Sequence, residues 1–220
     1  MEQAEFDKAL IAAAFAIAAR DGWDAVSVPR AAREAGLDLA EARERFPGRA
    51  AILLRFGRMA DKAALAGPET QGTVRDRLFY MLMQRLDVMQ EHRAGVIALL
   101  RHLPFDPPLA LMLKLATDRS MRWMLETAGV RTRGLRGELR VRALSGLWIW
   151  TMRAWERDET SDMSATMRVL DTALARAERL AGWFGGGPRP EFSAEEAGAP
   201  AADEMPPEPE SPPPPELGPV

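Results

Sequence analysis

Residues 27–49 have the sequence SVPRAAREAGLDLAEARERFPGR, and this stretch decides the fold. Ser27 is a residue type that caps the start of a helix, and Pro29 is tolerated in the first helical turn. Gly36 stands where such a helix would end. The pattern therefore predicts a short helix over residues 30–35.

A second short helix follows almost at once. Asp38 is an N-cap residue, and Glu41 three positions later completes a capping pattern, so we expect a helix over 39–45 that ends before Pro47. Only two residues lie between the first helix and this N-cap, so the chain has room for nothing but a sharp turn. Two short helices joined in this way predict a helix-turn-helix.

The flanking sequence continues the helical pattern in both directions. No segment alternates with the period of two that marks a strand, so we expect an all-α chain. The other expected helices cover residues 5–19, 49–65, 73–90, 93–102, 109–128, 138–157 and 161–183. The repeat at helical spacing within residues 73–90 consists of Val74, Leu78, Met81, Leu82, Arg85, Leu86 and Met89.

Composition divides the chain into parts. The net charge of −3 conceals a body with 28 basic and 24 acidic residues and a final stretch with one basic and eight acidic residues. Eleven of the 17 prolines lie in that stretch, whose low apolar content cannot offset the entropy of ordering. We predict a helix-turn-helix module over 1–66, a helical ligand-binding and dimerisation domain over 67–185, and a disordered or polyproline II tail over 186–220. Recruitment of partners is the alternative role for the tail.

Several kinds of chemistry lack the residues they need. There is no cysteine, and His92 and His102 have no partner motif, so we expect no metal site. No serine has a histidine partner and no glycine-rich phosphate loop is present, so we expect no catalytic residues, no cofactor and no enzyme activity. No apolar stretch has the ~20 residues of a membrane span and no signal sequence opens the chain, so we expect a cytoplasmic protein.

The amino-terminal residues resemble the DNA-binding module of the TetR family of transcriptional regulators. The resemblance covers about residues 9–58 and rests on the order and spacing of Asp21-Gly22-Trp23, Val26-Ser27, Ala31-Ala32, Ala35-Gly36-Leu37, Phe46-Pro47, Arg49 and Ile52-Leu53. It implies a homodimer that binds palindromic operator DNA. It also implies a carboxy-terminal domain that binds a small apolar effector.

A second family is similar to the same residues. The TetR-like accessory proteins of ubiquinone biosynthesis hold isoprene lipids for a partner hydroxylase, and they share the Gly-Trp, Ala-Ala, Gly-Leu-Asp and Phe-Pro-Gly elements. Residues 142–180 also resemble the end of their carboxy-terminal domain, although an Asn-x-Tyr-x-x-Arg element expected near 136–142 is absent. This resemblance implies, as the alternative function, a protein that binds an isoprenoid or quinone intermediate and does not bind DNA.

The expected DNA contacts lie on the second short helix and beside it. From the way a recognition helix enters the major groove, they are Ser27, Asp38, Leu39, Ala40, Arg43, Glu44 and Arg49. Arg43 and Arg49 suit phosphate or guanine, whereas the TetR pattern has a basic or hydroxyl residue, a glycine and an aromatic at Leu39, Ala40 and Arg43. Residues 1–66 contain ten basic and ten acidic residues, and a neutral module is a poor general DNA binder. A helix-turn-helix kept only for its structure is therefore the alternative.

Bulky apolar residues on two later helices are candidates for an effector site. They are Met112, Trp123, Met124, Trp148, Met152 and Trp155. Their helical spacing suits an apolar cavity for a quinone-like, polyprenyl or aromatic ligand, and methionine adapts to varied shapes. The same spacing is typical of an ordinary bundle core, which is the alternative.

The last two helices suggest two further contacts. In a TetR-like homodimer they would pair across a two-fold axis into a four-helix bundle. The apolar, small-residue face proposed for that contact consists of Leu170, Ala173, Leu174, Ala177 and Leu180. Trp183 and Phe184 are candidates for a peripheral membrane contact, with packing against the bundle as the alternative.

Overall fold

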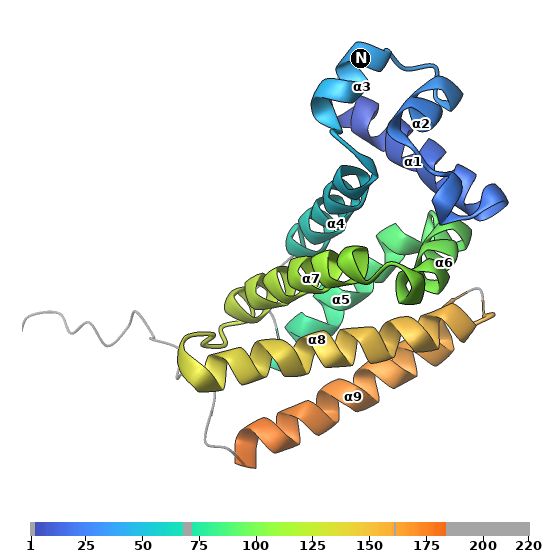
Figure 1. Cartoon of the computed structure of the whole chain (residues 1–220). Coiled ribbons are helices and arrows are strands. Elements are labelled where there is room, and N and C mark those ends of the chain that lie inside the picture. Colours follow the sequence, from blue (N-terminus) through green and yellow to red (C-terminus); the bar gives the residue numbers. More distant parts are fainter. Residues whose placement is uncertain (1–2, 68–71, 161, 184–220) are drawn as a thin grey trace, which may run out of the picture. The chain divides into compact units, whose positions relative to one another are not determined.

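The computed structural model of the chain describes residues 3–67, 72–160 and 162–183, and every regular element in these ranges is a helix (Figure 1). The all-α prediction is therefore confirmed. The elements are α1 (Gln3–Asp21), η1 (Trp23–Ala25), α2 (Val28–Glu34), α3 (Leu39–Arg45), α4 (Arg49–Leu65), α5 (Val74–Gln90), α6 (Arg93–His102), η2 (Leu103–Phe105), α7 (Pro107–Thr127), α8 (Gly134–Arg157) and α9 (Ser164–Trp183), where η marks a 3₁₀ helix. The proposed tail and the side chains of Leu180, Trp183 and Phe184 lie outside the described residues.

The two short helices form where the capping residues predict them. Ser27 Oγ accepts a hydrogen bond from the backbone N–H of Arg30 at 3.3 Å, and Asp38 Oδ1 accepts one from that of Glu41 at 2.8 Å. Gly36 has a φ of 65°, a left-handed conformation that costs glycine little and lets the chain turn between α2 and α3. The expected bounds of α3 agree with the structure, while α2 begins and ends slightly earlier than expected.

Helices α7 and α8 begin earlier than the sequence pattern predicts. Pro107 lies in the first turn of α7, where its missing N–H has no helical partner to lose, and so it does not break the helix. Asp106 caps that turn by accepting the backbone N–H of Leu109 at 3.0 Å. Gly134, expected in a loop, starts α8 with a φ of 72°.

The described helices pack within one compact unit. Helix α1 packs against α2, α4 and α6, and α4 packs against α5 and α7. Helices α8 and α9 run side by side, and each has a second neighbour, α7 for α8 and α5 for α9 (Figure 1). The expected boundary after residue 66 therefore falls between helices that are in close contact.

Phe15 links the helix-turn-helix module to the helices that follow it. The centroid of its ring lies 4.6 Å from the ring centroid of Phe56 on α4 and 5.4 Å from that of His92, which precedes α6. Burial lowers the pKa of His92, so the neutral imidazole stacks on Phe15. By length and composition, no single described helix could cross a membrane, although α6 and η2 taken with α7 pass that test as a pair bent by 119°.

Candidate functional site

The outer face of α3 carries the residues predicted to contact DNA bases. Leu39 is 43% exposed, and Ala40, Arg43 and Glu44 are exposed beside it. Arg43 Nη1 donates to the carbonyl oxygen of Pro47 at 2.9 Å, so this side chain lies along the turn after α3. The structure thus brings four predicted contacts onto one exposed surface.

A groove of about 450 Å³ borders this surface. Residues of α2, α3, the turns beside them and the start of α4 line it, including Ser27, Arg33, Leu39, Arg43, Phe46 and Arg49. Arg33 is exposed on α2 and was not among the predicted contacts. Ser27 lines the groove and Asp38 does not, and the side-chain oxygens of both cap helices, so both residues have a structural role.

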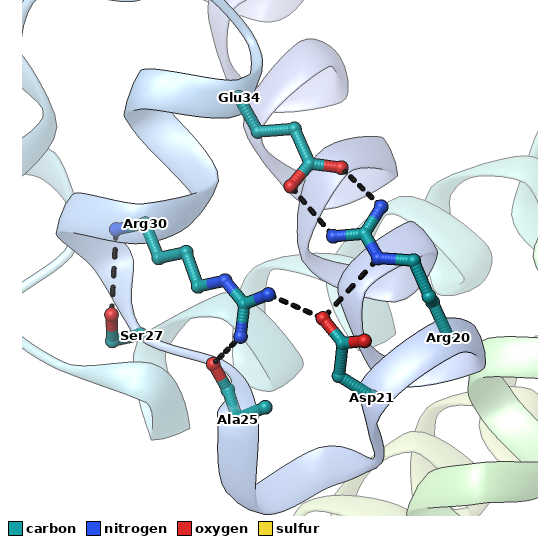
Figure 2. A network of polar contacts seen from close by, with 6 residues as sticks. All are labelled: Arg20, Asp21, Ala25, Ser27, Arg30 and Glu34. Carbon is teal, nitrogen blue, oxygen red and sulfur yellow. Dashed lines mark hydrogen bonds and ion pairs between the residues drawn. The ribbon is translucent and has the colours of Figure 1, made fainter.

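Two other arginines near α2 are held by carboxylates, as Figure 2 shows. Arg20 forms a two-pronged pair with Glu34 at 3.0 and 3.1 Å, and Arg30 contacts Asp21 and donates to the carbonyl oxygen of Ala25 at 3.2 Å. The hydrogen bond with Glu34, followed by that with Asp21, raises the pKa of Arg20. These contacts hold both ends of α2, through Arg30 and Glu34, against the end of α1.

Asp7 pairs with two more arginines of the module. The carboxylate lies 2.7 Å from Arg45 Nη2 at the end of α3 and 2.9 Å from Arg55 Nε on α4. Arg45 also donates to the backbone carbonyl of Gln3 at 2.9 Å. Asp7 is buried, so these pairs join α1 to α3 and α4 rather than adding positive charge to the outer surface.

Arg49, a predicted phosphate contact, begins α4 and lies between two carboxylates. Its Nη2 is 3.1 Å from Asp106 Oδ2, and its Nη1 is 3.8 Å from Asp24 Oδ1. His102 lies between the same two acids, with Nδ1 3.3 Å from Asp24 and Nε2 3.8 Å from Asp106. We call these four residues the junction cluster. It joins η1 and α4 to α6 and α7.

The predicted effector-site residues do not all lie together. Met124, Trp148, Met152 and Trp155 are buried, whereas Trp123 is 61% exposed. The prediction for Trp123 needs correction, because this residue lies on the outer side of α7 while its neighbour Met124 points inward. Met112 is half-buried on the same helix.

Trp155 has a specific set of partners in the core. Its Nε1 donates to Gln90 Oε1 at 2.9 Å, and the Arg93 guanidinium lies 4.7 Å from its ring centroid. A buried indole N–H needs such an acceptor. These contacts favour the core role that was the alternative for Trp155.

A polar cluster that the sequence pattern did not predict lies in the helical interior. Arg85 on α5 is 4% exposed and pairs with Asp61 on α4, and Ser120 on α7 donates to Asp61 at 2.6 Å. The Arg85 guanidinium carbon lies 5.2 Å from the ring centroid of Trp148 on α8. We call these four residues the interior cluster. The available signal was a charged residue at Arg85 within an otherwise apolar helical repeat.

Solved structures with the same arrangement of helices come from three bacteria. A TetR transcriptional regulator from Nitrosomonas europaea has a TM-score of 0.65 at 20% identity, covering 80% of this chain and 99% of that one. A TetR-family regulator from Streptomyces coelicolor has a TM-score of 0.55 at 23% identity, covering 83% of this chain and 85% of that one. A putative TetR-family regulator from Rhodococcus sp. also has a TM-score of 0.55, at 20% identity, covering 78% of this chain and 98% of that one. The chain has the TetR fold. No protein-family model and no curated protein matches the sequence.

In this TetR fold, α8 and α9 present an apolar outer face. On α8, Leu135 is 80%, Leu139 57% and Trp150 62% exposed, at spacings that place them on one side of the helix. A groove of about 790 Å³ continues this face onto α9, where Val169, Thr172, Ala173 and Ala177 are among its lining residues. Leu170 and Leu174, predicted to lie on this face, are instead buried inside the chain.

Proposed function

We propose that this protein is a dimeric DNA-binding transcriptional regulator whose helical domain responds to a small effector. One observation carries the proposal: in a TetR fold, α2 and α3 form a helix-turn-helix whose α3 leaves Leu39, Ala40, Arg43 and Glu44 exposed together. An exposed second helix of this motif has the shape that enters the major groove.

The chemistry of this face favours sequence-selective binding over strong general attraction. Arg33 and Arg43 supply positive charge at the groove, and arginine suits phosphate or the O6 and N7 acceptors of guanine. Glu44 can accept from the amino group of cytosine, and Leu39 can contact a thymine methyl group. Because Arg20, Arg30, Arg45 and Arg55 are paired inside the module, few phosphate contacts remain, so we expect a shallow dependence of affinity on salt.

Titration of the full chain with its own upstream intergenic DNA tests this proposal. Fluorescence anisotropy at low and physiological salt should give a sequence-preferring complex, and Arg43→Ala should weaken it by about 1–3 kcal/mol. Arg119→Ala, at an exposed arginine of α7, is the matched control and should leave the affinity unchanged. Equal binding to the upstream DNA and to shuffled DNA would contradict the proposal.

The proposed dimer pairs α8 and α9 with the same helices of a second copy. The apolar stripe along α8 and the small residues in the adjoining groove support this, because together they allow helices to approach closely. Gly146 lies in the middle of α8, and apart from its own stretch of helix no atom lies within 4 Å of where its Cβ would be, so the centre of this face is open for a partner helix.

Light scattering after size exclusion tests the dimer. Trp150→Glu should shift the protein to a monomer at micromolar concentration, because it places a charge on the apolar face. Leu111→Glu is the control, since Leu111 is 58% exposed on α7 and does not line the α8–α9 groove. A dimer that persists in Trp150→Glu would argue against this interface.

A lipid-binding accessory role without DNA binding is the second candidate. The observation that favours it is the ion pairing of five of the ten basic residues in the module, Arg20, Arg30, Arg45, Arg49 and Arg55. Native mass spectrometry of protein from a quinone-producing host separates the two functions. A co-purified isoprenoid lost in Trp148→Ala, with no DNA binding by wild type, would favour this candidate.

A further inference from the structure

The interior cluster places one buried cation at the meeting point of four helices. Arg85 comes from α5, Asp61 from α4, Ser120 from α7 and Trp148 from α8. The Arg85 side chain is 5% exposed, whereas that of Asp61 is 25% exposed. The cluster therefore reaches solvent on the Asp61 side, along α4.

The pairing of Arg85 is incomplete. Asp61 engages one terminal nitrogen and the Trp148 ring lies beside the guanidinium, but the buried Nε has no hydrogen-bond partner. Burial lowers the pKa of Arg85, while Asp61 opposes that shift. A buried ion pair of this kind adds little to stability compared with apolar residues of the same volume, so folding alone does not explain its presence.

Methionines surround the cluster one helical turn away. Met81 and Met89 lie four residues to either side of Arg85, Met124 lies four residues after Ser120, and all three are buried. Met152 stands in the same relation to Trp148 and is also buried. Residues four apart share a helix face, and methionine repacks readily around different shapes. The apolar surroundings of the cation are therefore adaptable.

We infer that Arg85 is the binding group for the carboxylate of an apolar effector, which replaces Asp61 as its partner. The guanidinium fork matches a carboxylate, Trp148 covers it, and the methionines accommodate the apolar part of the ligand. The anion enters where Asp61 meets solvent. This inference deepens the proposed function, since it names the chemical class of the effector.

Displacement of Asp61 also couples ligand binding to the helix-turn-helix. Asp61 lies on α4, and a short turn joins the end of α3 to the start of α4. Arg85 on α5 and Ser120 on α7 both contact α4 through this one carboxylate. A ligand carboxylate on Arg85 removes the stronger of the two contacts and loosens α4.

Direct binding without DNA tests the inference. The probes are octanoate, dodecanoate and benzoate, each compared with its uncharged alcohol, octanol, dodecanol and benzyl alcohol, by isothermal titration calorimetry on the full chain. Wild type should prefer at least one carboxylate over its alcohol by about tenfold, the scale of one charge-assisted hydrogen bond. No preference for any carboxylate in wild type and in Asp61→Asn would overturn the inference.

Two variants give opposite expected results. Asp61→Asn removes the competing charge and should tighten carboxylate binding by about tenfold. The double variant Arg85→Met/Asp61→Leu removes both charges while keeping the volume, should still fold, and should lose the preference for carboxylates. Asp118→Asn is the matched control, because Asp118 pairs with Lys114 on the same helix at 2.6 Å and should not affect the affinity. Tighter binding by the double variant would also overturn the inference.

These titrations contain no DNA, so their outcome is independent of the proposed operator binding. If carboxylates bind as expected but the upstream DNA does not, the effector site stands and the regulatory function fails. If the DNA binds but no carboxylate binds wild type more tightly than the double variant, the regulatory function stands and the effector class is wrong.

Discussion

Arg93, the first residue of α6, donates hydrogen bonds to the backbone carbonyls at the carboxy-terminal end of α8. Its guanidinium donates to the backbone carbonyls of Trp155, Glu156 and Asp158 at 2.9, 3.2 and 2.7 Å and lies over the Trp155 ring. The last carbonyls of a helix lack the usual helical donor. Arg93 supplies donors to the carbonyls of Glu156 and Asp158, and a second donor to that of Trp155, which also accepts the backbone N–H of Asp158 at 3.2 Å.

Arg93→Ala should therefore lower the free energy of unfolding by about 2–4 kcal/mol, because three charge-assisted hydrogen bonds and a cation–π contact are lost. Arg93→Lys should recover only part of this, since a single ammonium nitrogen cannot replace the two terminal nitrogens that contact these carbonyls or stack on the indole as a planar guanidinium does. Urea denaturation followed by circular dichroism measures both. The control is Arg157→Ala at an exposed position, expected to change stability by less than about 0.5 kcal/mol.

Asp158 organises the turn between α8 and α9. Its carboxylate accepts the backbone N–H and hydroxyl of Thr166, both at 2.7 Å, and the hydroxyl of Thr160 at 2.5 Å. Burial alone would raise the pKa of Asp158, but these hydrogen bonds outweigh it and hold the pKa well below its usual range. The carboxylate therefore stabilises the folded chain in its ionised form.

Asp158→Asn should lower the free energy of unfolding at pH 7 by about 2 kcal/mol, because the amide cannot accept the same set of donors. The depressed pKa contributes stability above the unfolded value, about 3.9, and that contribution is lost as the pH falls below it. The difference between wild type and variant should therefore shrink from pH 5 to pH 3 in urea denaturation. Glu159→Gln, an exposed neighbour, should show no such trend; a constant difference for Asp158→Asn would contradict this account.

At the scale of elements, the contact of α1 with α6 depends on a glycine. A Cβ at Gly95 on α6 would lie 2.3 Å from the carbonyl oxygen of Phe15 on α1, too close for the two backbones to stay as they are. Gly57 on α4 has no atom within 4 Å of that position. Both glycines are within helices, where alanine is intrinsically favoured by about 1 kcal/mol.

The two alanine substitutions should therefore have opposite signs. Gly57→Ala should raise the free energy of unfolding by about 0.5–1 kcal/mol, and Gly95→Ala should lower it by about 1–3 kcal/mol because α6 must move away from α1. Thermal and urea denaturation of both variants measure the difference. Stabilisation by Gly95→Ala would mean that the helices separate at no cost.

The limits of most elements could be predicted from sequence because their signals are local. The caps Ser27 and Asp38 and the turn at Gly36 placed α2 and α3 closely, and the bounds of α4 and α6 agree with the structure. The start of α7 was missed because Pro107 is as compatible with a first helical turn as with a break. Only the preceding cap, Asp106, distinguishes the two.

The candidate sites were predicted less completely, because their polar contacts join distant parts of the chain. The exposed face of α3 follows from local periodicity, and so does the inward face of α8 with Trp148. The partner of Arg49 lies 57 residues away and that of Arg85 lies 24 residues away, and no periodicity links such pairs. For the same reason, local spacing placed Leu170 on the outside although it is buried in the packing of α9 with its neighbouring helices.

At the scale of the whole molecule, the junction cluster binds one predicted DNA contact, Arg49, to the helices that follow the helix-turn-helix. Arg49 lines the groove beside α3, yet its guanidinium is bound to Asp106, the cap of α7. A phosphate and Asp106 would compete for the same nitrogens, so the position of α7 influences how much positive charge the module offers to DNA.

Asp106→Asn should therefore strengthen DNA binding by about threefold to tenfold and steepen the dependence of log affinity on log salt by about 0.9, the value for one added phosphate contact. Asparagine can still accept the backbone N–H of Leu109, so the cap of α7 is kept and the change isolates the charge. Fluorescence anisotropy across a salt series measures both quantities. The double variant Asp106→Asn/Arg49→Gln should return the slope to the wild-type value, because the added contact needs the guanidinium. An unchanged slope in Asp106→Asn would show that Arg49 does not reach phosphate even when its partner is removed.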